Sequence, residues 1–570
     1  MARNNAPIPD DELRKDVEAY VASGGNRSEA ARLRDMPRVT FRDRLKLAEK
    51  RFRLHLGKIV DGRRDYVEAR QMPLPKKGGI ARYILTSAQN NTHPHKDGLN
   101  NLLAYVNFLD KLPKASCQLM IGTFSYAIDA YGEKAVKRGT WLAKGDALGK
   151  LWYAPELTPY FCDESVQLAP GLVWCGEMNI LPTTANPLTG LAEYNGRNSN
   201  IIPHVLFAME SIASLPDEAT KFNYTTGTIT LRNYIQKRTG IVAERRHCYG
   251  ALLVEVDDGG NWYVRQLQIG EKGEIYDIGP TGCRSVKIWD GNVKTISAKR
   301  DPAQEESYVE AVTWGDLHAA EMQLWVRELG FAPGGMLDQL APKKQIWHDV
   351  FSMRARSHHE LKNFHRMYEK MVDGEGIVQD EIQVTADFAR EAHRAWIETV
   401  VVRSNHDRHL DRWLNDADPT RDPVNARYFM ELQARLLKAL DDGDKDFNIL
   451  EFALHRAEGG LPDGIRFLGE DESYVICKNA PGGGIECGLH GDLGPNGSRG
   501  STRALTKLSR PANKAHDHTA TIQWPVFSAG SCALDLPYMK GPNAHSVSHI
   551  VNFVNGARQI ITFWNGKFRA

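Results

Sequence analysis

The C-terminal half of the sequence repeatedly places a polar motif directly after a short apolar segment, and this pattern constrains the fold most strongly. In the clearest case, Val400 to Val402 run into Ser404-Asn405-His406-Asp407. A β-branched run of this length predicts a short buried strand, and the polar residues fall where that strand gives way to a helix. Open α/β sheets bind ligands at this edge. The simpler alternative is a helix N-cap by Asn405 or Asp407 beside a surface histidine.

Four further motifs share this context, at or just after a predicted strand. Each is weak evidence alone, because an isolated Asp-x-His or His-x-His is more often a surface feature than a ligand site. Together, and in this order, they predict one functional site. The five motifs contain Asp316 and His318; Asp349; Asn405, His406 and Asp407; His490 and Asp492; and His516 and His518.

The composition is that of an ordinary globular protein. The chain has 570 residues, of which 42% are hydrophobic and 25% charged, and this length suggests about two to four domains. Strand-like and helix-like segments alternate along most of the chain, which predicts a multidomain α/β fold. The net charge is only +1, so any affinity for nucleic acid must come from local patches.

Nothing in the sequence predicts export or a membrane partner. There is no run of about 18 apolar residues, and the N-terminus lacks the apolar region of a signal peptide. The eight cysteines are scattered without a CxxC pair, which favours reduced thiols over a zinc ribbon. We therefore expect a cytoplasmic protein.

Residues 1–56 are expected to be a helical DNA-binding module. A helix ending at Gly24-Gly25, a short helix around Ala30-Ala31 and a basic helix resemble the helix-turn-helix of bacterial and phage DNA-binding proteins. Ten Lys and Arg between Arg27 and Arg53 face four acids. The resemblance implies that one helix enters the major groove, although a solvated helical bundle is the alternative. The residues expected to contact DNA are Arg38, Thr40, Arg42 and Arg44.

The rest of the chain divides into three predicted segments. Residues 57–80 end in a Pro, Lys and Gly cluster and are predicted to be a linker. Residues 81–300 are predicted to be an α/β domain, whose role the sequence does not indicate, with a hairpin across Asp-Gly-Gly at 258–260. Residues 301–570 carry the five motifs and are predicted to be the catalytic domain.

The five motifs together resemble those of calcineurin-like metallophosphoesterases, and in particular of the repair-nuclease branch of that family. The family pattern is D-x-H, GD-x-x-D, GN-H-D/E, a lone His and GH-x-H, and the similarity covers about residues 305–535. The resemblance implies a four-layer α/β/β/α catalytic domain that holds two divalent metal ions. The order of domains resembles that of phage-encoded DNA-processing proteins, which implies the cytoplasm of a bacterial host.

The resemblance also implies a role for each residue. Asp349 would bridge the two metals, His406 would protonate the leaving oxygen as general acid, and Asp407 would orient the ring of His406. The mixed nitrogen and oxygen set suits Mn²⁺ best, with Fe or Zn²⁺ as alternatives, and suits Mg²⁺ alone poorly. One metal would be held by Asp316, His318, Asp349 and His518, and the other by Asp349, Asn405, His490 and His516.

The sequence departs from the family pattern in three places. The second motif reads WHDVFS, so His348 or Asp349 could be the ligand, and a bridge favours the carboxylate. Ser404 and Ala515 stand where glycine is usual. On the glycine-rich loop after His490, Arg499 could contact a substrate phosphate.

These features predict a two-metal phosphodiesterase acting on DNA, a nuclease. The alternatives are a phosphatase or cyclic-nucleotide phosphodiesterase, or a DNA-binding regulator or scaffold with a degenerate phosphoesterase domain. Related nucleases often form homo-oligomers, but the sequence does not show the oligomeric state. Nor does it distinguish endonuclease from exonuclease action.

Overall fold

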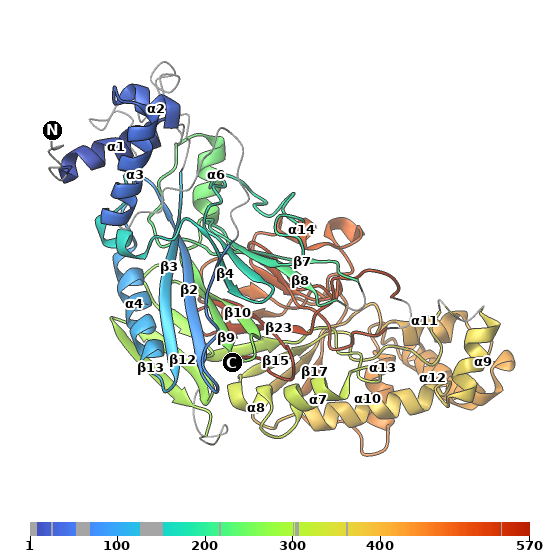
Figure 1. Cartoon of the computed structure of the whole chain (residues 1–570). Coiled ribbons are helices and arrows are strands. Elements are labelled where there is room, and N and C mark those ends of the chain that lie inside the picture. Colours follow the sequence, from blue (N-terminus) through green and yellow to red (C-terminus); the bar gives the residue numbers. More distant parts are fainter. Residues whose placement is uncertain are drawn as a thin grey trace, which may run out of the picture.

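The protein is a multidomain α/β structure built from several sheets (Figure 1). The computed structural model describes residues 8–23, 27–52, 69–125, 152–215, 218–299, 301, 307–358, 360, 363–536 and 539–570. Within these residues no helix is long and apolar enough to cross a membrane.

The N-terminal residues form three helices, as expected for residues 10–52. These are α1 (Asp10–Ala22), α2 (Arg27–Leu33) and α3 (Arg38–Phe52). They pack around a small core in which Tyr20, Ala30, Phe41 and Leu45 are buried. Residues 53–68, which include the first half of the predicted linker, lie outside the described residues. The end of that segment is structured, because Arg70–Gln71 form strand β1.

The largest sheet draws strands from both sides of the boundary expected at residue 300. Strands between residues 70 and 225 join strands between residues 475 and 528 where Met209 pairs with Ile522. The two segments therefore share a sheet and a core, which contains Leu206, Phe207 and Phe527. The strand order is β1 (Arg70–Gln71), β4 (Ser165–Ala169), β5 (Leu172–Cys175), β6 (Ser199–Ile202), β8 (Lys221–Thr225), β7 (Ala208–Ile212), β21 (Thr521–Gln523), β22 (Val526–Ser528), β20 (Ala512–Lys514), β19 (Ile485–Glu486) and β18 (Val475–Ile476).

Two smaller sheets complete the middle of the chain. Parallel strands β2 (Ile80–Gln89) and β3 (Ala115–Phe124) are joined through α4 (Lys96–Asp110). The predicted hairpin is confirmed by β9 (Gly250–Asp257) and β10 (Trp262–Gln268). The other elements here are β11 (Ile275–Asp277), β12 (Cys283–Trp289), β13 (Asn292–Ser297), α6 (Arg238–Arg246) and the 3-10 helix η3 (Pro155–Tyr160).

A six-stranded sheet carries most of the predicted motifs. Its order is β17 (Ile465–Phe467), β16 (Glu398–Val401), β15 (Lys344–Trp347), β14 (Val309–Thr313), β23 (Ser548–Phe553) and β24 (Arg558–Thr562). Strands β14 to β17 are parallel, and β23 and β24 are antiparallel.

Both faces of the six-stranded sheet are covered, as is usual for parallel strands. Successive side chains of a strand point to opposite faces. Trp347 and Val401 accordingly pack in the core that contains the helices. Ile346 and Val400 pack against residues of β18 and β19 in the large sheet. The two sheets thus meet face to face.

The helices of the C-terminal half lie mainly in a lobe at one end of the molecule (Figure 1). The lobe is formed by α9 (Phe364–Val372), α10 (Val378–Ala392), α11 (His409–Asp416), α12 (Pro423–Asp441) and α13 (Ile449–Arg456). Outside it lie α7 (Leu324–Phe331), α8 (Met336–Leu340) and α14 (Thr502–Leu505), and the short 3-10 helices are η4 (Pro419–Arg421) and η5 (Pro495–Gly497).

Candidate metal centre

The five sequence motifs converge at one place, between the two facing sheets. The loops after β14, β15 and β16 start at neighbouring carboxyl ends of the six-stranded sheet, and the loops after β19 and β20 come from the large sheet. The residues brought together are Asp316, His318, Asp349, Asn405, His406, Asp407, His490, His516 and His518.

The backbone of these loops is close-packed and locally strained. A Cβ at Gly315 would lie 2.6 Å from the carbonyl oxygen of Gly530, so only glycine allows this approach. His318, Asp349, His516 and His518 all have positive φ angles, of 45°, 45°, 75° and 55°. Such angles cost free energy in non-glycine residues and concentrate at functional sites.

The first predicted ligand group is assembled around Asp316. The Nε2 atom of His518 lies 3.2 Å from Oδ2 of Asp316 and 3.3 Å from Nε2 of His318. Nε2 of His318 lies 3.8 Å from Oδ2 of Asp349. The ligand atoms of Asp316, Asp349 and His518 lie within 4.8 Å of one another, as do those of His318, Asp349 and His406.

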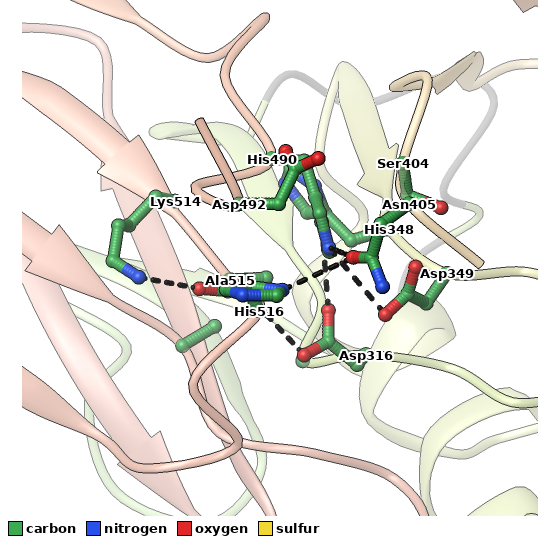
Figure 2. A network of polar contacts seen from close by, with 12 residues as sticks. Asp316, His348, Asp349, Ser404, Asn405, His490, Asp492, Lys514, Ala515 and His516 are labelled. Carbon is green, nitrogen blue, oxygen red and sulfur yellow. Dashed lines mark hydrogen bonds and ion pairs between the residues drawn. The ribbon is translucent and has the colours of Figure 1, made fainter. Parts of the chain in front are cut away.

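The second predicted group adjoins the first through Asp349 (Figure 2). The amide oxygen of Asn405 lies 2.9 Å from Nε2 of His490 and 3.1 Å from Nδ1 of His516. Nε2 of His490 lies 3.5 Å from Oδ2 of Asp349. That carboxylate oxygen is therefore close to an imidazole nitrogen from each of the two predicted groups, His318 of the first and His490 of the second.

The electrostatics of the site favour a bound cation. Burial raises the pKa of Asp349 to about 7, and burial together with the charge of Asp349 raises that of Asp316 well above its usual range. Burial lowers the pKa values of His318, His490 and His518, so these rings are neutral. Both carboxylate oxygens of Asp349 are buried, and hydrogen bonds with the Ser404 side chain and the His406 backbone only partly oppose the rise in its pKa.

These residues fit a divalent metal. Neutral imidazoles, buried carboxylates and an amide oxygen are the donors that Mn²⁺, Fe and Zn²⁺ accept. An uncompensated buried carboxylate is costly unless a cation neutralises it.

His406 and Asp407 differ in part from their expected arrangement. Nδ1 of His406 lies 3.2 Å from the carbonyl oxygen of Ser352. Asp407 was expected to orient this ring, but its Oδ1 accepts a hydrogen bond of 3.2 Å from the backbone N–H of Phe351. The Ser352 carbonyl thus takes the orienting position, and Asp407 holds the loop after β15.

Three residues near the site were not assigned a role from the sequence. The ring of His348 lies against His490, with 3.5 Å between their Nδ1 atoms, while Asp349 points into the ligand group. Lys514 is fully buried and its Nζ donates to Asp517 and to the carbonyl of Ala515 (Figure 2). Ser352 lies 3.0 Å from His318. His348 is the residue that the sequence left open as an alternative ligand to Asp349, and Ser352 stands where the family pattern has its second aspartate.

The residues expected to contact DNA differ in their exposure to solvent. Arg38, Thr40 and Arg42 are exposed on α3. Arg44 is turned inward, because its Nε donates to the buried carboxylate of Asp16 over 2.6 Å. Arg499 is exposed on the loop after His490.

The fold and the site define a multidomain α/β protein with a buried aspartate and histidine cluster at the carboxyl ends of parallel strands. A comparison with known sequences identifies a relative of this protein. The chain is 33% identical over 505 residues to protein A1 of Escherichia phage T5, which covers 86% of this chain and 83% of the phage protein. The chain belongs to the family of that protein. No family model and no solved structure matches it.

Proposed function

We propose that the protein is a two-metal phosphodiesterase that cleaves DNA. The observation that carries this proposal is the position of Asp349, whose Oδ2 lies 3.8 Å from Nε2 of His318 and 3.5 Å from Nε2 of His490, one ring from each predicted group. A carboxylate that bridges two metals needs this arrangement. Under the same proposal, the two facing sheets and their flanking helices are a metallophosphoesterase domain.

Under this proposal, different residues of the chain have different roles in the reaction. Bound divalent ions supply Lewis acidity toward a phosphodiester and lower the pKa of an attacking water. The Ser352 carbonyl fixes the ring of His406 through Nδ1. Nε2 of His406 would then deliver a proton to the leaving oxygen, which requires the ring to carry protons on both nitrogens as imidazolium before the step. The Arg408–Asp492 ion pair joins the loop of His406 to the loop of His490.

DNA as the substrate is supported by the exposed face of α3. Residues spaced by four lie along one helix face, and four exposed cations have this spacing: Arg38, Arg42, Lys46 and Lys50. We propose that α2 and α3 belong to a helix-turn-helix module whose basic stripe contacts phosphates. Removing each phosphate contact should lower the slope of log affinity against log salt by about one.

The test of the proposed activity is cleavage of plasmid and linear DNA by the full chain with Mn²⁺, Mg²⁺ or EDTA. Wild type should retain about two Mn²⁺ per chain, as the two-metal chemistry requires, and should cut DNA. His406→Asn should keep its metal but cut about 10²- to 10⁴-fold more slowly. Metal binding with cleavage of a chromogenic phosphodiester but not of DNA would support the small-substrate alternative. DNA binding without metal would support the regulator alternative.

A further inference from the structure

The loop after β15 is fixed from both sides by buried carboxylates. Oδ1 of Asp407 accepts from Phe351 N, and the two oxygens of Glu381 accept from Arg354 N and Ala355 N, both over 2.7 Å. Between these anchors Met353 has a φ of 55°, which is strained for a bulky side chain. Glu381 comes from α10, so the helical lobe also holds this loop.

The residue presented by this loop is Ser352, which reaches two imidazoles with two different atoms. Its Oγ lies 3.0 Å from Nδ1 of His318, and its carbonyl oxygen lies 3.2 Å from Nδ1 of His406. A serine hydroxyl can accept a hydrogen bond as well as donate one. Nε2 of His318 faces Asp349 and His518, and a ring nitrogen that binds a metal carries no proton. The ring proton then lies on Nδ1, which donates to Oγ of Ser352.

We propose that Ser352 is a positioning residue that sets the ring of His318 through its hydroxyl and the ring of His406 through its carbonyl. With its proton on Nδ1, His318 presents a bare Nε2 to Asp349 and His518. Partners of this kind fix the tautomer of a metal-binding histidine, and their loss typically weakens metal binding about 10- to 100-fold. The inference rests on the proposed function, because it assigns His318 as a metal ligand.

The two contacts can be separated by mutation, since a side-chain change removes the hydroxyl and leaves the carbonyl. Ser352→Ala in the full chain should bind Mn²⁺ about 10- to 100-fold more weakly by isothermal titration calorimetry. At saturating Mn²⁺ its cleavage rate should remain close to that of wild type, because His406 keeps its carbonyl partner. Ser352→Thr, which restores a hydroxyl, should recover most of the affinity.

The matched control is Ser307→Ala, which removes another buried hydroxyl, one that donates to Leu340 O at the opposite end of β14. It should leave Mn²⁺ affinity unchanged. If Ser352→Ala does not fold, Ser352→Cys offers a weaker hydrogen-bonding group of similar size and should shift affinity in the same direction. If Ser352→Ala folds and binds Mn²⁺ as tightly as wild type does, or if Ser352→Cys does so where Ser352→Ala does not fold, the inference is wrong and the proposed function still stands. Absence of Mn²⁺ binding by wild type would overturn both the inference and the proposed function.

Discussion

Two buried clusters of charged residues in this protein have opposite electrostatic character. The paired cluster, in the middle of the chain, contains Arg82, Glu255, Arg265 and Asp277. Arg265 donates to Asp277 over 2.7 and 2.9 Å and to Glu255 over 2.6 Å, and Arg82 donates to Glu255 over 2.7 Å. In the candidate metal centre, Asp316 and Asp349 face imidazole rings instead.

The pKa values of the buried carboxyl groups are shifted in opposite directions in the two clusters. Burial acts to raise the pKa values of Glu255 and Asp277, but the neighbouring guanidinium groups outweigh it, so both values are lowered. The pKa values of Asp316 and Asp349 are raised, because there burial dominates. A cluster whose charges are already matched stabilises a fold. A cluster whose charges are unmatched is organised to receive a ligand.

The largest effect is expected when the paired cluster loses its central cation. Arg265→Met leaves Glu255 and Asp277 buried without their main partner, which should cost about 3–5 kcal/mol in the free energy of unfolding. Urea denaturation with and without Mn²⁺ measures this cost, which should be the same in both conditions. A loss of about 1 kcal/mol or less, the size expected for a surface pair, would contradict the comparison.

The metal centre should respond to metal where the paired cluster does not. At a free Mn²⁺ concentration 100 times the Kd, wild type should gain about 2.7 kcal/mol of stability. Asp349→Asn removes the carboxylate that we propose bridges the two metals and should gain almost nothing, as measured by thermal unfolding. Asp492→Asn is the control, because this carboxylate is already paired with Arg408 and its loss should leave the Mn²⁺ effect in place.

A smaller effect is expected from pH at Asp407. Burial and the charge of Asp349 raise its pKa to about 7, from a usual value of 3.8. Stability contributed by the neutral carboxyl is therefore complete below its unfolded pKa and lost as the pH rises through about 7. Asp407→Asn stays neutral and can still accept from Phe351 N.

The relative stability of Asp407→Asn should therefore improve between pH 5 and pH 8. We expect at least about 1 kcal/mol, since one pKa unit corresponds to about 1.4 kcal/mol. Denaturation of the metal-free proteins at the two pH values measures the change. A stability difference from wild type that does not vary with pH would show that Asp407 is not strained by its charge.

The smallest effect tests a third charged cluster, in the N-terminal helices. Asp16 is buried and is held by Arg34 and Arg44. Arg44→Gln should cost about 1 kcal/mol of stability, because Arg34 remains and the site is partly open to solvent. Its DNA affinity should match that of wild type, whereas Arg42→Gln should weaken DNA binding without a loss of stability. The reverse pattern would return Arg44 to the DNA-contacting face.

The sequence was most informative where local pattern and chemistry coincide. The strands at 344–347 and 398–401 and the polar residues after them could be predicted, because β-branched runs and strand-end motifs are local features. The inward turn of Arg44 could not, since it depends on Asp16, which lies on another helix. Ser352 stands where the family pattern has its second aspartate, but its role could not be predicted, because that role depends on a loop conformation set by Asp407 and Glu381. The shared sheet could not be predicted either, since pairing between residues 209 and 522 leaves no local sequence pattern.

That shared sheet has a consequence for the order in which the protein is made. Strand β7 pairs with β21 in the shared sheet, and β14 pairs with β23 in the six-stranded sheet. In both pairs the first strand is made more than two hundred residues before its partner. Contacts of such long range form slowly and leave strand edges exposed meanwhile. His516 and His518 lie within the last tenth of the chain. The proposed ligand set is therefore incomplete until translation is almost finished, and under the proposed function a prematurely ended chain should not cut nearby DNA.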